Sequence, residues 1–257
     1  MTHYRIKWLG HLAIALGLVL SASVHNVAEA AKINNIVLVH GAFADGSSWS
    51  AVTARLQGMG YHVTAVQNPL TSLADDVEAT KRVLQRLQGD VLLVGHSWAG
   101  AVVTEAGNSP NVRGIVYLSA LVPDSGESAS DLLQRLKAPM EGMVPDANGL
   151  IWLDNPEQYR AVMAGDVPLD KVQALVAVQQ PIAAKAFGDR IQQAAWKNKP
   201  TWYLLTENDK ALNPSIQKAI ASHIGAKTQS ISSSHMSLVS HPEVVADFID
   251  SAAKAVK

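Results

Sequence analysis

A serine stands at the end of a run of aliphatic residues in the segment VLLVGHSWAG, residues 91–100. The apolar run is typical of a buried strand, and the residues around Ser97 are small, namely Gly95, Ala99 and Gly100. Two interpretations fit this pattern. The small residues fill a tight turn, or the turn presents the serine hydroxyl beyond the strand as a nucleophile. Because serine is a weak nucleophile by itself, the second interpretation requires a base elsewhere in the chain.

An acid and a histidine follow the serine along the chain, each after a predicted strand. Asp209 lies in ENDKALNP and His235 lies in SSSHMS. A neutral imidazole is able to take the serine proton near neutral pH, and a carboxylate fixes the imidazole tautomer and stabilises the imidazolium that forms. Ser97, Asp209 and His235 are therefore the candidate catalytic residues, in the order Ser, acid, His.

Other acids and histidines compete for these roles. Glu207 also follows the fifth strand, and Asp124 follows the fourth, but Asp209 is the preferred acid. His241 is the main competitor of His235; it directly precedes Pro242 and is typical of a helix start. The remaining candidates have simpler explanations: we expect His40 and His96 to orient loops, and His62 and His223 to lie in a strand and a helix. No two histidines have the H-x-H or H-x-x-x-H spacing of a metal site.

The elements that must position these residues alternate along the chain. Short, mostly aliphatic segments predict strands near residues 33–41, 61–66, 90–95, 113–120 and 201–206, with helical periodicity between them, and residues 226–232 continue the alternation. Ser72 has the spacing of an N-cap for the helix that follows it. Alternation of this kind predicts an α/β fold with a mainly parallel sheet of about six strands and helices on both faces. Ligands bind beyond the carboxyl ends of such strands, where the candidate residues lie.

The alternation stops between about residues 121 and 196. This stretch has no obvious strand and contains the helical fragments SASDLLQRLK and LDKVQALVAVQQ. We interpret it as a helical cap inserted after the fourth strand, the alternative being an elaborated crossover. Its apolar residues are candidates for a substrate pocket or for the cap's own core: Met140, Met143, Trp152, Tyr159 and Met163.

The segments VLVHGAFADGSSW, VGHSWAG and SHMSLVSHPEVVADFI resemble the α/β-hydrolase superfamily, and within it the small esterases related to plant methylesterases and hydroxynitrile lyases. The resemblance covers essentially all of residues 31–257. It implies that Ser97 is the nucleophile, Asp209 the acid and His235 the base. It also implies that the backbone N–H groups of Ala42 and Trp98 form the oxyanion hole. The sequence departs from the G-x-S-x-G pattern at Ala99, a position that requires only a small side chain.

Phe43 and Trp98 flank the predicted oxyanion hole, and Phe43 is the candidate substrate-binding residue. An apolar site with few charges suits a neutral carboxylic ester or lactone. No cofactor is expected. A lyase acting through the same residues is an alternative, but lyase relatives typically carry Thr and Lys at the positions of Gly41 and Met236 here. A non-catalytic binding protein of the same fold is a second alternative.

The first thirty residues predict export. Arg5 and Lys7 precede a short apolar segment, and AEA ends at Ala30, which is the pattern of a signal peptide over residues 1–30 followed by a hydrolase domain over 31–257. A retained anchor is the alternative. We therefore expect a periplasmic or secreted protein without stable membrane association. The net charge of −1 argues against a nucleic-acid partner, and the absence of cysteine excludes disulfides and a thiol nucleophile.

Overall fold

A computed structural model of the chain describes residues 1–2, 33–138 and 142–256. The predicted signal peptide, except for its first two residues, lies outside the described residues. Within the described part of the chain, no helix has both the length and the apolar character that crossing a membrane would need.

Six parallel strands form the main sheet, as the sequence predicts. They are β1 Asn35–Val39, β2 His62–Val66, β3 Val91–His96, β4 Val112–Leu118, β7 Thr201–Thr206 and β8 Lys227–Ile231. Their order across the sheet is β2-β1-β3-β4-β7-β8, and every neighbouring pair is parallel. All carboxyl ends therefore meet at one edge, which brings together the loops that carry the candidate residues.

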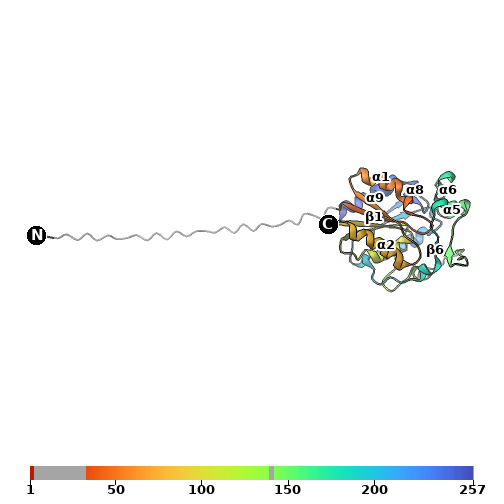
Figure 1. Cartoon of the computed structure of the whole chain (residues 1–257), viewed down its shortest axis with the longest axis horizontal. Helices are drawn as coiled ribbons and strands as arrows, with labels where there is room; N and C mark the ends of the chain where they lie inside the picture. Colours follow the sequence, from red (N-terminus) through yellow and green to blue (C-terminus); the bar gives the residue numbers. More distant parts are fainter. Residues whose placement is uncertain (3–32, 139–141, 257) are drawn as a thin grey trace.

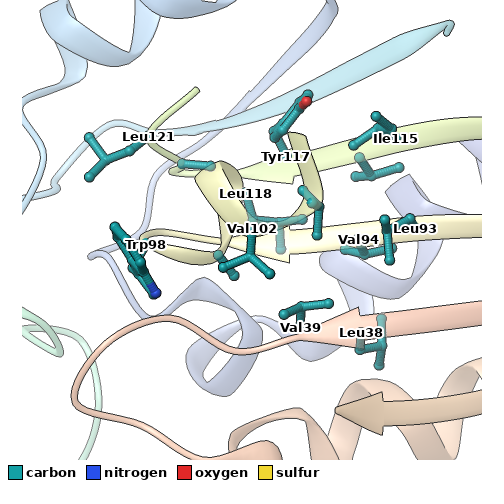
Figure 2. Packing of buried hydrophobic residues seen from close by; sticks show 14 of the residues in the cluster. Leu38, Val39, Leu93, Val94, Trp98, Val102, Ile115, Tyr117, Leu118 and Leu121 are labelled. Carbon is teal, nitrogen blue, oxygen red and sulfur yellow. The ribbon is translucent and has the colours of Figure 1, made fainter. Parts of the chain in front are cut away.

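The sequence of each strand matches its place in the sheet. β1 and β3 are buried along their whole length and consist mainly of aliphatic residues, because helices cover both faces of the centre of the sheet. β8 reads KTQSI and is largely exposed, as expected of an edge strand. Side chains of β1, β3 and β4 belong to one core together with Val102 of helix α3 (Ala99–Ala106) (Figure 2).

Helices cover both faces of this sheet. The 3-10 helix η1 spans Gly46–Trp49, and the covering helices are α1 Ser50–Gly58, α2 Leu73–Arg86, α3 Ala99–Ala106, α7 Pro214–His223, α8 Ser237–Ser240 and α9 Pro242–Ala255. α1 packs against α9, and α2 against α3. Figure 1 shows α1 and α9 on one side of β1 and α2 on the other. Ser72 caps α2 by accepting the N–H of Asp75, as predicted.

The segment between β4 and β7 has more structure than the sequence suggests. It contains α4 Ala129–Arg135, β5 Leu150–Ile151, α5 Pro156–Val162, α6 Leu169–Val178, β6 Ile182–Ala183, η2 Ala184–Gly188 and η3 Ala195–Lys197. Both predicted helical fragments are present, but the expectation of no strand is wrong, because β5 and β6 pair antiparallel. Two residues are too few to show the alternation by which a strand is recognised. α5, α6 and β6 lie together at one end of the molecule (Figure 1).

Candidate active site

Ser97 occupies a sharp turn between β3 and α3. Its φ angle is +54°, in the left-handed region that is costly for a residue with a side chain. The turn is held on both sides, because Ser97 N donates to Leu118 O at 3.0 Å and Gly100 N donates to Ser97 O at 2.9 Å. A Cβ on Gly95 would lie 2.7 Å from Ala99 O, so the strand and the helix pass too closely for a larger residue. Position 95 therefore requires glycine, and the small side chain of Ala99 is fully buried.

The loop after β1 passes directly beside this turn. A Cβ added to Gly41 would lie 2.8 Å from the Cβ of Ser97 and 2.9 Å from His96 O. The next residue, Ala42, is therefore held close to the serine. Among the described residues, no acceptor is bonded to the backbone N–H of either Ala42 or Trp98. Both amides have a free donor, which an oxyanion hole requires.

His235 and Asp209 form a buried hydrogen-bonded pair. His235 Nδ1 lies 2.7 Å from Asp209 Oδ2, and both side chains are buried. Because Nδ1 faces the carboxylate, it carries the ring proton, and Nε2 is left as the basic nitrogen. The pair joins the loop after β8 to the loop after β7, as the sequence order predicts.

Asp209 receives four more hydrogen bonds. Its Oδ2 accepts from Thr206 Oγ1 at 2.8 Å and Gln217 Nε2 at 2.9 Å. Its Oδ1 accepts the N–H groups of residues 211 and 212 at 2.8 and 2.7 Å. Burial raises the pKa of Asp209, but the neighbouring His235 and these hydrogen bonds outweigh burial and lower the pKa below its usual value. The carboxylate is therefore ionised and ready to orient the imidazole.

His96 links the loop that contains His235 to the serine turn. Its Nε2 donates to His235 O at 3.0 Å, and the two rings lie 4.7 Å apart between centroids. Since His96 directly precedes Ser97, these contacts hold the loop of His235 against the residue next to the serine. Burial, followed by the neighbouring His235, lowers the pKa of His96 to about 3. His96 therefore stays neutral and orients the loop, in line with its expected role.

The competing residues face other partners. His241 Nε2 lies 3.3 Å from Asp166 Oδ2, at the start of α9. Asp124 binds Lys197 at 2.5 Å, and Glu207 accepts from Ser230 Oγ at 2.8 Å. Each alternative acid, and the alternative base, is therefore bonded to a residue outside the Asp209–His235 pair. His40 orients a loop, since its Nε2 accepts the N–H of Asn68 and its Nδ1 donates to Gly41 O.

The predicted pocket residues divide into two groups. Tyr159 and Met163 are buried against the site, and Tyr159 Oη donates to Phe43 O at 3.1 Å. Met143 is partly buried, whereas Trp152 is 46% exposed and binds Asp146 through its indole N–H. Met140 lies outside the described residues. The ring of Trp98 packs on Phe187 of η2 at 5.1 Å, a contact that the sequence did not indicate.

Asp76, which the sequence analysis missed, is tied to the serine turn. Its Oδ2 accepts the indole N–H of Trp98 at 2.8 Å, and its Oδ1 accepts the N–H of Leu70 at 2.8 Å. Burial raises the pKa of Asp76 to about 6, although the two hydrogen bonds oppose this shift. A signal was present, because Asp76 lies in the apolar stripe of α2 together with Leu73 and Val77. Gln217 lies in the buried stripe of α7 in the same way.

A groove of about 300 Å³ lies between α1, α6 and α8, with Ala51, Leu175 and Leu238 in its lining. None of the candidate catalytic residues lines it, so we treat it as separate from the site. Among the described residues, no three His, Cys, Asp or Glu side chains are grouped as a metal site.

Comparison with known proteins gives a consistent family. The sequence model of the alpha/beta hydrolase family matches residues 36–248. The pyrethroid hydrolase of Sphingobium wenxiniae is 26% identical to this chain, over 86% of this chain and 90% of its own length. Polyneuridine aldehyde esterase of Rauvolfia serpentina is 22% identical, over 86% and 96% of the two chains.

Solved structures share the fold. A crystal structure of polyneuridine aldehyde esterase matches with a TM-score of 0.74 at 20% identity, covering 86% of this chain and 100% of the esterase chain. An extracellular alpha/beta-hydrolase from a Paenibacillus species matches with a TM-score of 0.73 at 22% identity, covering 85% and 98%.

Proposed function

Because this chain belongs to the alpha/beta hydrolase family, we propose that it acts through Ser97, His235 and Asp209. Its named relatives are esterases and other hydrolases, and the chain is a carboxylic-ester hydrolase. One observation carries this proposal. The buried Asp209–His235 pair lies against His96, and the next residue, Ser97, is presented by a strained turn at the carboxyl end of β3. A strained backbone at such a position favours a functional role over a simple turn.

The proposed reaction has two halves. In the first, His235 Nε2 takes the proton of Ser97 Oγ as the oxygen attacks the ester carbonyl carbon. The N–H groups of Ala42 and Trp98 donate to the oxyanion of the tetrahedral intermediate. The intermediate collapses, the C–O bond to the alcohol breaks, and His235 returns the proton to the leaving alcohol. In the second half, water attacks the carbonyl carbon of the acyl-serine with His235 as its base. The C–O bond to Ser97 Oγ then breaks, His235 returns the proton to that oxygen, and the acid is released.

We propose a neutral ester or lactone as the substrate, and no cofactor enters the scheme. The side chains that flank the proposed oxyanion hole support this class, because Phe43 and Trp98 are apolar. We further propose that the enzyme works after export, in the periplasm or outside the cell, with neither nucleic acid nor membrane as a partner. The N-terminal pattern of residues 1–30 and the extracellular relative support export.

The lyase alternative finds less support. The position that carries Thr in lyase relatives is Gly41 here, and any Cβ there would meet Ser97 and the backbone of His96. Met236, which follows His235, is fully buried and has no charge to offer a cyanide leaving group.

A panel of p-nitrophenyl esters and lactones, assayed with the wild type and with Ser97→Ala, tests the proposed function. We expect hydrolysis of at least one neutral ester by the wild type and loss of nearly all of it in the variant. A cyanohydrin in the same panel separates a lyase from a hydrolase. Binding of an ester without turnover would indicate the non-catalytic alternative.

A further inference from the structure

Two contacts from the segment between β4 and β7 hold the loop of the catalytic base. Met236 N donates to Met163 O at 3.0 Å, directly after His235. Directly before it, Ser234 N donates to Asp166 Oδ2 at 3.0 Å. Both acceptors belong to the short turn that joins α5 to α6, residues 163–168. The base is therefore held from both neighbouring residues by one turn.

Asp166 is the polar centre of this contact. Besides Ser234 N, its carboxylate accepts from Ser233 Oγ at 2.9 Å and from Ser234 Oγ. The fourth partner is His241 Nε2, at 3.3 Å. Burial raises the pKa of Asp166, but the hydrogen bonds from Ser234 and Ser233 outweigh burial and lower it below its usual value. An ionised carboxylate is a strong acceptor for all of these donors.

The loop that Asp166 holds needs an external support. Residues 232–236 form neither helix nor strand, yet Ser233, Ser234 and His235 are buried. A general base must be placed within a fraction of an ångström of its working position. Asp209 orients the imidazole, and His96 holds the carbonyl of His235. The backbone N–H groups on the two sides of the base are bonded to the 163–168 turn instead.

We propose that Asp166 is a positioning residue for the reaction, whose carboxylate fixes the 233–234 backbone and thereby sets the place of His235 relative to Ser97. This inference rests on the proposed function of His235 as the base. It also means that α5 and the turn after it contact both the loop after β1 and the loop of His235. Tyr159 of that helix binds the carbonyl of Phe43 beside the oxyanion loop, and the turn after the helix holds the base. One short segment thus links the two loops between which the ester carbonyl would lie.

The test compares Asp166→Asn with Asp154→Asn, the same change at an exposed position of the same segment. The amide keeps the size of Asp166 but loses its charge and half of its acceptor capacity. We expect kcat of Asp166→Asn to fall by roughly tenfold or more, with KM within about twofold, because the displaced group acts in the chemical step. Asp154→Asn should stay within about twofold of the wild type in both constants. A melting curve checks that each variant is folded at the assay temperature.

A second variant, Ser234→Ala, removes one donor to Asp166 and decides the matter if Asp166→Asn does not fold. We expect a smaller fall in kcat, and a double variant whose loss is less than the product of the two single losses. Unchanged kcat in either folded variant, or a rise in KM alone, would overturn the inference. Activity that survives in Ser97→Ala would instead overturn the proposed function, so the two failures are distinguishable.

Discussion

The two halves of the site are built by different means. At β1 and β3 the serine turn is defined by the close approach of backbones, since added Cβ atoms at Gly41 or Gly95 would lie under 3.0 Å from neighbouring atoms. At β7 and β8 the proposed acid and base are positioned by hydrogen bonds and charge, with five donors around Asp209. Steric exclusion of side chains at Gly41 and Gly95 therefore defines the first half, and hydrogen bonds to Asp209 define the second.

Two buried carboxylates show the consequence of this difference. Asp209 faces an imidazole and four other donors, and its pKa is lowered. Asp76, beside the serine turn, has two N–H donors and no cationic partner in the described part of the chain, and burial raises its pKa to about 6. Near neutral pH Asp209 is ionised, whereas Asp76 gains or loses its proton near pH 6.

The largest effect is expected on the acid–base side. In Asp209→Asn the amide no longer stabilises the imidazolium, and it favours the wrong tautomer of His235. We expect kcat to fall by about four orders of magnitude, with the fold retained. Steady-state kinetics on one ester, with circular dichroism as a control for folding, measures this. A fall of less than about tenfold would mean that another acid serves the base.

An intermediate effect is expected at Asp76, on stability rather than on chemistry. Both of its oxygens accept N–H donors, so an amide at this position would leave one donor facing an NH₂ group. Asp76→Asn should lower the free energy of unfolding by about 1–3 kcal/mol near pH 7. Urea unfolding of the two proteins checks this value. Equal stability would contradict the two hydrogen bonds as the structure has them.

The pH dependence of stability gives a second observable for Asp76. Its pKa is about 6 in the fold and 3.8 in the unfolded chain, so between these values only the unfolded state releases the proton. The contribution of Asp76 to stability is thus complete below pH 4, declines as the pH rises towards 6 and is constant above it. The stability difference between wild type and Asp76→Asn should therefore shrink from pH 4 to pH 6. A difference that grows over this range would contradict the raised pKa.

The smallest effect is expected at His241. Its ring binds the partly exposed Asp166 and has no contact with Asp209. His241→Ala should change kcat by no more than about twofold, since Asp166 keeps its hydrogen bonds to residues 233 and 234. Steady-state kinetics on the ester used for Asp209→Asn measures the change. Loss of activity comparable to that of Asp209→Asn would reverse the assignment of the base.

Much of this arrangement could be predicted from the sequence, because it depends on local patterns. Mostly aliphatic segments and the regular alternation located the six strands, and the position of each polar residue after a strand placed Asp209 and His235 at one edge of the sheet. The Asp209–His235 contact then follows from the parallel order of β7 and β8.

The rest depends on contacts between residues far apart in the chain. Asp166 lies in a turn without periodicity and meets Ser234 across 68 residues. The β5–β6 pair is two residues long on each side, too short for a recognisable pattern. Asp76 and Gln217 could have been predicted to be buried polar residues, because each lies in an otherwise apolar helical stripe. Such a residue indicates an internal hydrogen-bond partner, but the stripe does not identify that partner.

The rate at which a serine-directed organophosphonate labels the protein tests the central claim, that the base of one half activates the serine of the other. Mass spectrometry locates the adduct, and the rate is compared among wild type, His235→Ala and His241→Ala. We expect a single adduct on Ser97, formed rapidly in the wild type and in His241→Ala and slower by at least about a hundredfold in His235→Ala. An adduct on another serine with Ser97 unmodified, or labelling of His235→Ala at the wild-type rate, would contradict it.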